Sequence, residues 1–180
     1  MVHGSVVLFL STLFSNESLN MNYLHQLDQG FVNFYDSTRT DYVPGSGVLF
    51  VAGTNTSGIH GKGAAKTANL YYGAPKGHYN GHHGRYYGIP TREVYWLKTG
   101  GSEQQRIRLL SLPLERIAKY VQEFVEYTHK TQYTFLVTAV GCGHAGYTDA
   151  QIAPMFKDAV RCWYPDTWKP YVLNEDEQNS

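Results

Sequence analysis

The chain has 180 residues, with 15 basic and 15 acidic side chains, so its formal net charge is zero. The length predicts a single domain with a core of its own. The balanced charge argues against nonspecific binding to nucleic acid, which needs an excess of Lys and Arg. Two cysteines, Cys142 and Cys162, are too few for a disulfide framework, and we expect a cytoplasmic protein.

Residues 1–20 contain an apolar run from Val6 to Leu10, which is too short to span a bilayer. A signal peptide would place Lys or Arg before the run and a small-residue cleavage site after it, and neither is clear. The segment is either a poorly ordered extension, an added element, or the product of translation upstream of a true start at Met21. We expect no membrane partner, one domain over residues 21–172, and a polar tail at 173–180.

The first half of the domain is predicted to hold two strands and a helix. The continuous apolar run Val48–Ala52 is typical of a strand that is covered on both faces. Residues 64–70 have the composition of a helix, and Tyr86–Ile89 predicts a second short strand, which Pro90 ends.

The second half begins with the clearest helical pattern in the chain. Apolar residues at helical spacing predict a helix from Leu114 to Thr128, with Pro113 in its first turn. Residues 133–140 then predict another buried strand. Alternating strands and helices are typical of a single α/β domain.

The last predicted helix has an ambiguous start. Thr148 and Gln151 fit a capping box, which would begin a helix there. Pro154 would then lie inside that helix, where it costs about 3 kcal/mol. We therefore expect a turn at 148–152 and a helix from about residue 154 to residue 160.

The 18 glycines form two concentrations, nine between residues 53 and 88 and three between 141 and 146. Residues 53–65 and 140–148 each follow a predicted strand and precede a predicted helix. Glycines let a backbone approach a ligand closely, and a helix N-terminus presents free N–H groups to an anion. Two such loops at the carboxyl ends of strands in one sheet would converge on a crevice, which favours a phosphate-containing ligand over two ordinary tight connections.

The motifs in these loops resemble those of macrodomains. The spacing Asn55-x5-Gly61-x-Gly63-x-Ala65 resembles the loop in which Ala-Ala-Asn leads into a glycine-rich helix start, and residues 143–147 resemble the second phosphate loop. More closely, residues 46–160 are similar to a group of uncharacterised phage and bacterial proteins that share His-Gly-Lys-Gly-Ala-Ala and Gly-Cys-Gly-x-Ala-Gly-Tyr.

This resemblance implies a macrodomain-like fold, a three-layer α/β/α sandwich around a mixed sheet that binds ADP-ribose or a related nucleotide. It implies that the asparagine at position 55 contacts the distal ribose. One side of the implied site consists of Gly53, Asn55, Gly61, Lys62, Gly63 and Ala64. The other side consists of Gly143, His144, Ala145, Gly146 and Tyr147.

Several polar residues in or near the loops have two interpretations each. His60 could bind a phosphate or ribose or act as a general base, or it could pack against its own turn. Lys62 could neutralise a phosphate or remain solvated. Asp149 stands at a helix start, where a carboxylate favours the helix dipole, and its alternative role is that of a catalytic acid.

His78, His82 and His83 share a glycine-rich loop, but no Cys or carboxylate lies within it to complete a metal site. We therefore expect no metal and no cofactor. The favoured interpretation is a mobile flap from which aromatic rings stack on a base, with Tyr79, Tyr86 and Tyr87 as candidates.

The leading hypothesis is a protein that binds an ADP-ribose-type small molecule, such as a phage factor in the host cytoplasm that sequesters a NAD-derived immune signal. The alternative is an ADP-ribosyl hydrolase in which Asn55, His60 and Asp149 position substrate or water. A third hypothesis is a protein-interaction module in which the loops only form turns.

Overall fold

A computed structural model of the chain describes residues 33–38, 47–98 and 105–173. The extension at 1–20 and its alternative start at Met21 lie outside the described residues, as does the polar tail beyond Leu173. No described helix combines the length and the apolar character that crossing a lipid bilayer requires.

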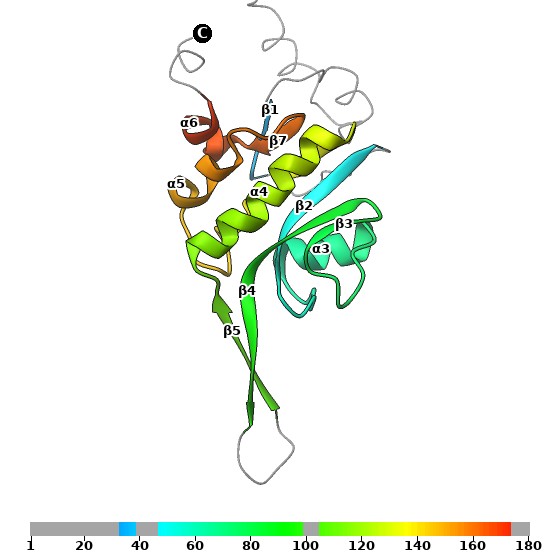
Figure 1. Cartoon of the computed structure of the whole chain (residues 1–180), viewed down its shortest axis with the longest axis vertical. Coiled ribbons are helices and arrows are strands. Elements are labelled where there is room, and N and C mark those ends of the chain that lie inside the picture. The colour runs from blue at the N-terminus through cyan, green and yellow to red at the C-terminus, as the bar shows by residue number, and fades with distance from the viewer. Residues whose placement is uncertain (1–32, 39–46, 99–104, 174–180) are drawn as a thin grey trace, which may run out of the picture.

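Strands and helices are interspersed along the described part of the chain (Figure 1). In chain order they are β1 (Asn33–Tyr35), β2 (Val48–Asn55), α3 (Gly63–Tyr71), β3 (Gly81–His83), β4 (Tyr86–Lys98), β5 (Gln105–Ser111), α4 (Leu114–Lys130), β6 (Thr134–Val137), α5 (Asp149–Ile152), the 3₁₀ helix η1 (Ala153–Phe156), β7 (Cys162–Pro165), the 3₁₀ helix η2 (Asp166–Trp168) and α6 (Lys169–Val172).

The strands form one mixed seven-stranded sheet in the order β1-β7-β6-β2-β4-β3, with β5 paired to β4. The five strands from β1 to β4 in this order are parallel, whereas β3 and β5 run antiparallel to β4. The predicted α/β class with a mixed sheet is therefore confirmed. The closer likeness to a macrodomain stays a prediction.

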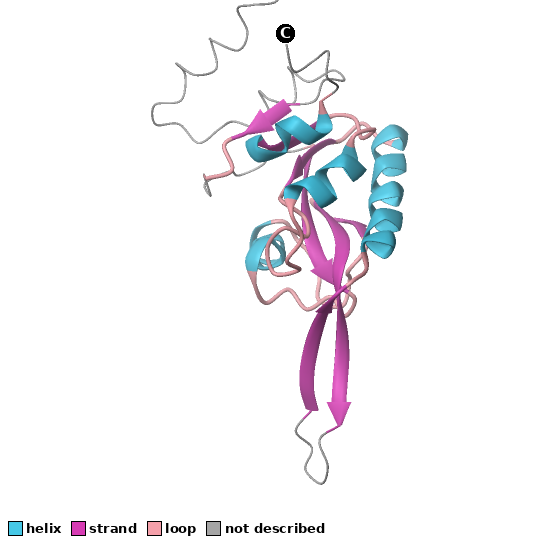
Figure 2. Cartoon of the chain, turned by 90° about the vertical axis from the view of Figure 1, so that its left-hand side faces the viewer, coloured by secondary structure: helices cyan, strands magenta, loops and turns pink. Residues whose placement is uncertain are grey.

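Helices cover both faces of the central strand β2. Leu49 and Val51 pack into a cluster with Phe124 and other side chains of α4, whereas Phe50 packs on the opposite face against Tyr72 at the end of α3. The rings of Phe50 and Tyr72 stack with their centroids 4.4 Å apart. In Figure 2 the sheet accordingly lies between α3 and α4.

Helix α4 forms where the sequence predicts it, because its apolar side chains repeat every three or four residues and lie on one face. Ile117, Val121 and Phe124 are almost completely buried along this face. The helix begins after Pro113 and ends at Lys130, which places a basic residue at the negative end of the helix dipole.

The prediction that Pro90 ends the second strand is wrong, because β4 continues to Lys98. Beside Pro90 the pairing of β4 with β2 contains a β-bulge. The regular ladder of hydrogen bonds is interrupted at a bulge, so a proline without an N–H is tolerated there. Beyond the bulge, β4 leaves β2 and pairs with β5 from Arg92 to Lys98. These paired strands form a hairpin that projects from the body of the molecule (Figures 1 and 2).

The prediction for the last helix is also wrong. The capping box of Thr148 and Gln151 is formed, and α5 begins at Asp149. Pro154 lies in the first turn of the 3₁₀ helix η1. The N–H groups of a first turn have no partner within the helix, so the missing N–H of a proline breaks no hydrogen bond there. This helical segment ends at Phe156, and the predicted helix over 154–160 is replaced by η1 and a turn.

The loop between β2 and α3 depends on glycine at position 58. Gly58 has φ +63, and a Cβ on it would lie 2.4 Å from the carbonyl carbon of Gly77. We expect Gly58→Ala to lower the free energy of unfolding by at least about 1 kcal/mol, since the change adds both strain and a backbone clash. Urea denaturation of the purified protein measures this.

Gly61→Ala is the matched control, because Gly61 lies in the same loop and a Cβ there meets nothing within 4 Å. Its free energy of unfolding should stay within roughly 0.5 kcal/mol of the parent value. Equal urea midpoints for the two variants would contradict this account of the loop.

Candidate functional site

A cavity of about 510 Å³ opens at the carboxyl ends of β2 and β6. The loop after β2 leads to α3 on one face of the sheet, and the loop after β6 leads to α5 on the other side. The two loops therefore diverge, which leaves a crevice between them at the edge where α/β sheets usually bind ligands.

Both predicted glycine loops line this cavity. From the first loop, the wall contains Gly53, Asn55, Gly61, Lys62, Gly63 and Ala64. From the second loop, it contains Gly143, His144 and Ala145. The two loops approach one another closely, because a Cβ on Gly63 would lie 3.7 Å from the imidazole Cδ2 of His144.

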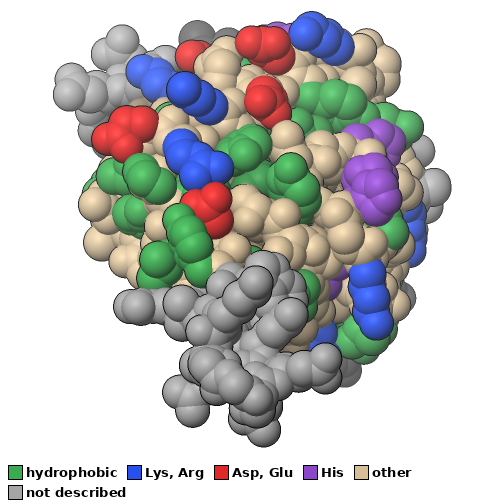
Figure 3. All heavy atoms as spheres, turned by 60° about the horizontal axis from the view of Figure 1, so that its bottom comes forward, with side chains coloured by type: hydrophobic (Ala, Val, Ile, Leu, Met, Phe, Trp, Pro, Cys, Tyr) green, Lys and Arg blue, Asp and Glu red, His purple; other side chains and the backbone are tan. Residues whose placement is uncertain are grey.

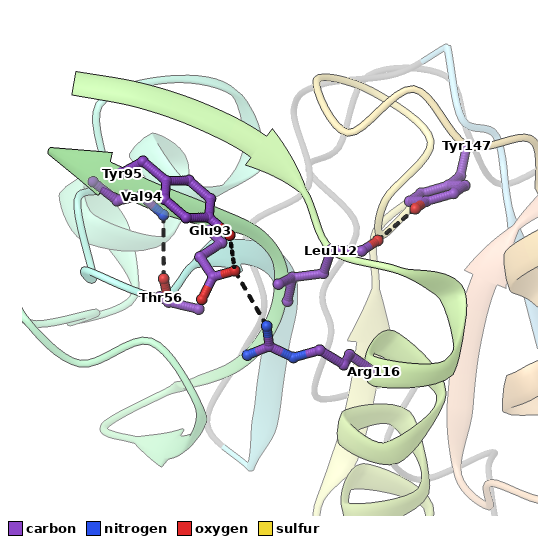
Figure 4. A network of polar contacts seen from close by, with 7 residues as sticks. All are labelled: Thr56, Glu93, Val94, Tyr95, Leu112, Arg116 and Tyr147. Carbon is purple, nitrogen blue, oxygen red and sulfur yellow. Dashed lines mark hydrogen bonds and ion pairs between the residues drawn. The ribbon is translucent and has the colours of Figure 1, made fainter. Parts of the chain in front are cut away.

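Gly146 and Tyr147, the other two residues predicted for this site, do not line the cavity. Gly146 closes a turn by donating its N–H to the carbonyl of Gly143 at 2.9 Å. Tyr147 packs against the main hydrophobic cluster, and its hydroxyl donates a short hydrogen bond to the carbonyl of Leu112 (Figure 4). Both residues thus shape the second loop from outside the cavity.

The N-terminus of α3 faces the cavity without a capping side chain. Lys62 occupies the N-cap position and makes no side-chain capping bond, and the next three residues, Gly63, Ala64 and Ala65, all line the cavity. The first N–H groups of a helix have no partner within the helix. This end of α3 consequently offers backbone donors and a partial positive charge to a ligand.

Asn55 organises the first loop through its side-chain amide. Its Oδ1 accepts hydrogen bonds from the N–H groups of Ser57 and Ile59, both at 3.2 Å, and its Nδ2 donates to the carbonyl of Ile59 at 2.7 Å. The side chain is 8% exposed and lies on the cavity wall. A primary amide has two N–H donors, and the contact with Ile59 uses one of them.

His60 lies outside the cavity wall and is 7% exposed. Its Nε2 is 3.0 Å from the carbonyl of Pro75, and its ring packs edge-on against Tyr86. Both partners belong to other segments, Pro75 to the loop after α3 and Tyr86 to β4, so this environment corresponds to the interpretation of His60 as a packing residue.

Asp149 also lies outside the cavity wall, at the first position of α5. Its Oδ1 accepts a hydrogen bond from the indole Nε1 of the buried Trp168 at 3.0 Å. The carboxylate thus links α5 to η2. Its position at the helix start corresponds to the structural role considered for it.

The histidine-rich segment is part of the sheet. His82 and His83 lie in β3, and the His78 and His83 rings have centroids 4.2 Å apart. Burial, followed by the charges of His78 and His82, lowers the pKa of His83. Within the described ranges, no three His, Cys, Asp or Glu side chains gather as a metal site would require.

The aromatic candidates of this segment are only partly accessible. Tyr86 and Tyr87 are 0% and 4% exposed and belong to the core, so the prediction that they can stack on a base is wrong. Tyr79 is 37% exposed.

The sequence pattern did not predict several residues that line the cavity. One of them, Arg92, is charged. Thr91 and Arg92 come from β4 just beyond Pro90, where the sequence pattern predicts that the strand has ended. Leu109 reaches the cavity from β5, and Thr138 and Gly141 from the loop after β6. Had this strand been predicted to continue through Pro90, Arg92 would have been a candidate for the site.

The charged residues on the cavity wall are all basic. Lys62 and Arg92 line the cavity, and the wall contains no Asp or Glu from the described part of the chain. On the face at the hairpin end, by contrast, acidic and basic side chains are intermixed with hydrophobic ones (Figure 3). The charged side chains of the cavity wall are thus of one sign, whereas both signs occur on that face.

Cys142 lies in the second loop but is a poor nucleophile. Burial, followed by the nearby Asp149 carboxylate, raises the pKa of its thiol to about 12. A thiol with a raised pKa stays protonated until the pH approaches that value, and only the thiolate attacks electrophiles. We expect iodoacetamide at pH 8 to alkylate Cys142 at least about 100-fold more slowly than free cysteine.

Mass spectrometry of the Cys142 peptide follows this reaction separately from that of Cys162. Unfolding the protein in urea removes the burial and should restore the rate of free cysteine. Rapid alkylation of Cys142 in the native protein would show that its thiol is ionised near neutral pH.

The chain was compared with models of protein families, with curated proteins and with solved structures. None of the three comparisons found a match. A function for the cavity is therefore argued from its own residues and from the motifs of its two loops.

Proposed function

We propose that the cavity binds the phosphate-containing part of an ADP-ribose-type nucleotide and that the protein sequesters this nucleotide. The observation that carries the proposal is the uncapped N-terminus of α3, which faces the cavity opposite the second glycine loop. Free N–H groups at a helix N-terminus bind phosphate well, because they donate hydrogen bonds along the positive end of the helix dipole.

The charge and the size of the cavity support the same ligand. An anion would meet Lys62 and Arg92 and no carboxylate among the described wall residues. The volume of about 510 Å³ lies within the range of roughly 300–1,000 Å³ that is usual for small-molecule sites. The identity of the nucleotide is taken from the resemblance of the loop motifs to macrodomains, since the charge of the cavity wall favours an anion of any kind.

The positions of the three predicted catalytic residues favour sequestration over hydrolysis by those residues. His60 is held by Pro75 and Asp149 by Trp168, and neither lines the cavity. Asn55 lines it, but an asparagine amide does not ionise near neutral pH, and its hydrogen-bond donors and acceptor are suited to positioning a ligand. A general acid or base would have to lie within hydrogen-bond reach of the reacting atoms.

Calorimetric titration with ADP-ribose, its cyclic isomers and adenosine tests the proposal. We expect heat of binding with the phosphate-containing nucleotides and none with adenosine. Denaturing the complex and recovering intact nucleotide would support sequestration, whereas recovery of a smaller product would support the hydrolase. No heat with any phosphate-containing nucleotide would contradict the proposal.

Side chains of increasing size at position 143 should fill the cavity without straining the loop. Gly143 lines the cavity, and a Cβ on it meets nothing within 4 Å. We expect Gly143→Ala to bind ADP-ribose almost normally and Gly143→Val about tenfold more weakly, a loss of about 1.4 kcal/mol. Gly143→Leu should bind more weakly still.

Thermal denaturation should give the same midpoint for all three variants, because the added atoms point into open space. Equal affinities across this series, in folded proteins, would place the ligand elsewhere.

A further inference from the structure

A β-bulge turns Arg92 toward the cavity. The register between β2 and β4 passes from Thr54 opposite Pro90 to Asn55 opposite Arg92, so that Thr91 has no partner on β2. Successive side chains of a regular strand point to opposite faces of the sheet. Here Thr91 and Arg92 both line the cavity, since the extra residue interrupts this alternation.

The guanidinium of Arg92 has spare donors at this position. Its Nη2 donates to the carbonyl of Leu109 at 3.0 Å. Its Nε is buried and has no hydrogen-bond partner among the described residues. A buried donor without a partner is unfavourable, and more so in a charged group, so we expect an acceptor from outside the chain to occupy this position.

The positive charge of Arg92 also lacks a counter-charge from the described residues of the cavity wall. The adjacent acidic residue, Glu93, is engaged elsewhere. Its carboxylate is 3.2 Å from Nη1 of Arg116 and accepts a hydrogen bond from the Tyr95 hydroxyl at 2.8 Å (Figure 4). The buried Nε without a partner, in a cation with no carboxylate on the same wall, points to an anion from outside the chain.

We propose that Arg92 binds an anionic oxygen group of the ligand, a phosphate, through Nε and the adjacent Nη. This deepens the proposed function and rests on it, because it assigns the ligand's charged group to a specific side chain. The bond to Leu109 holds the guanidinium plane before the ligand arrives. The phosphate is thus bound from the α3 side by backbone N–H groups and from the β4 side by a planar fork of two donors.

Two variants distinguish the contribution of the two-donor geometry from that of the positive charge. Arg92→Lys keeps the charge and loses the planar pair of donors, and Arg92→Gln removes the charge as well. Lys119→Gln is the matched control, because Lys119 is an exposed residue of α4 outside the cavity wall and its substitution removes the same charge. Calorimetry with ADP-ribose and with inorganic pyrophosphate should give about tenfold weaker binding for Arg92→Lys, since an ammonium cannot form the bidentate contact. Arg92→Gln should bind more weakly again, and Lys119→Gln should bind as the parent does.

Protection from phenylglyoxal, a reagent that modifies arginines, tests the unmutated protein and does not depend on the folding of a variant. Saturating pyrophosphate should slow the modification of Arg92. Arg116, which lies outside the cavity wall, should react at the same rate with and without the ligand. Mass spectrometry of the two peptides measures both rates.

The outcomes distinguish this inference from the proposed function. If the parent binds ADP-ribose while both Arg92 variants bind it equally well and Arg92 is not protected, the assignment of Arg92 is overturned and the proposed function stands. If pyrophosphate binds in an Arg92-dependent manner but ADP-ribose does not bind, the assignment stands and the proposed function fails. If neither ligand binds the parent, both are overturned.

Discussion

The backbone of β2 must find hydrogen-bond partners along both of its edges while its side chains stay buried on both faces, and the rest of the structure follows from this constraint. Parallel pairing with β6 and β4 supplies the partners, and parallel neighbours require long crossover connections. The connecting segments contain α3 and α4, which cover the two faces. As the strands are parallel, their carboxyl ends gather at one edge, and the cavity lies there.

The elements that the sequence predicts well are those with a strong local pattern. The strand at Val48–Ala52 and the helix α4 have continuous or periodic apolar side chains, which reflect burial directly, and α3 follows from its helical composition. Local patterns do not show which strand a neighbour pairs with, so the course of β4 beyond Pro90 was missed. The short strands β1 and β7 were missed for the same reason, because they are stabilised by pairing: β1 pairs with β7, and β7 also pairs with β6.

The same distinction holds for the candidate site. Glycine loops between strands and helices are local features, and both predicted loops lie on the cavity wall. The direction of a side chain depends on packing with distant residues, and therefore His60 and Asp149 could not be placed in advance. Both contact partners, Pro75 and Trp168, that lie 15 and 19 residues away in the chain. Arg92 reaches the cavity through a bulge that no spacing rule marks.

The uncapped end of α3 has a consequence for how this cavity can be mapped. Its donors are backbone N–H groups of Gly63, Ala64 and Ala65, and these residues have no side-chain atoms beyond Cβ to remove. Alanine scanning would leave nearly every one of these hydrogen bonds in place, so the affinity for the ligand would hardly change. Groups that are part of the main chain become visible only when amides are exchanged for esters or when their hydrogen exchange is followed.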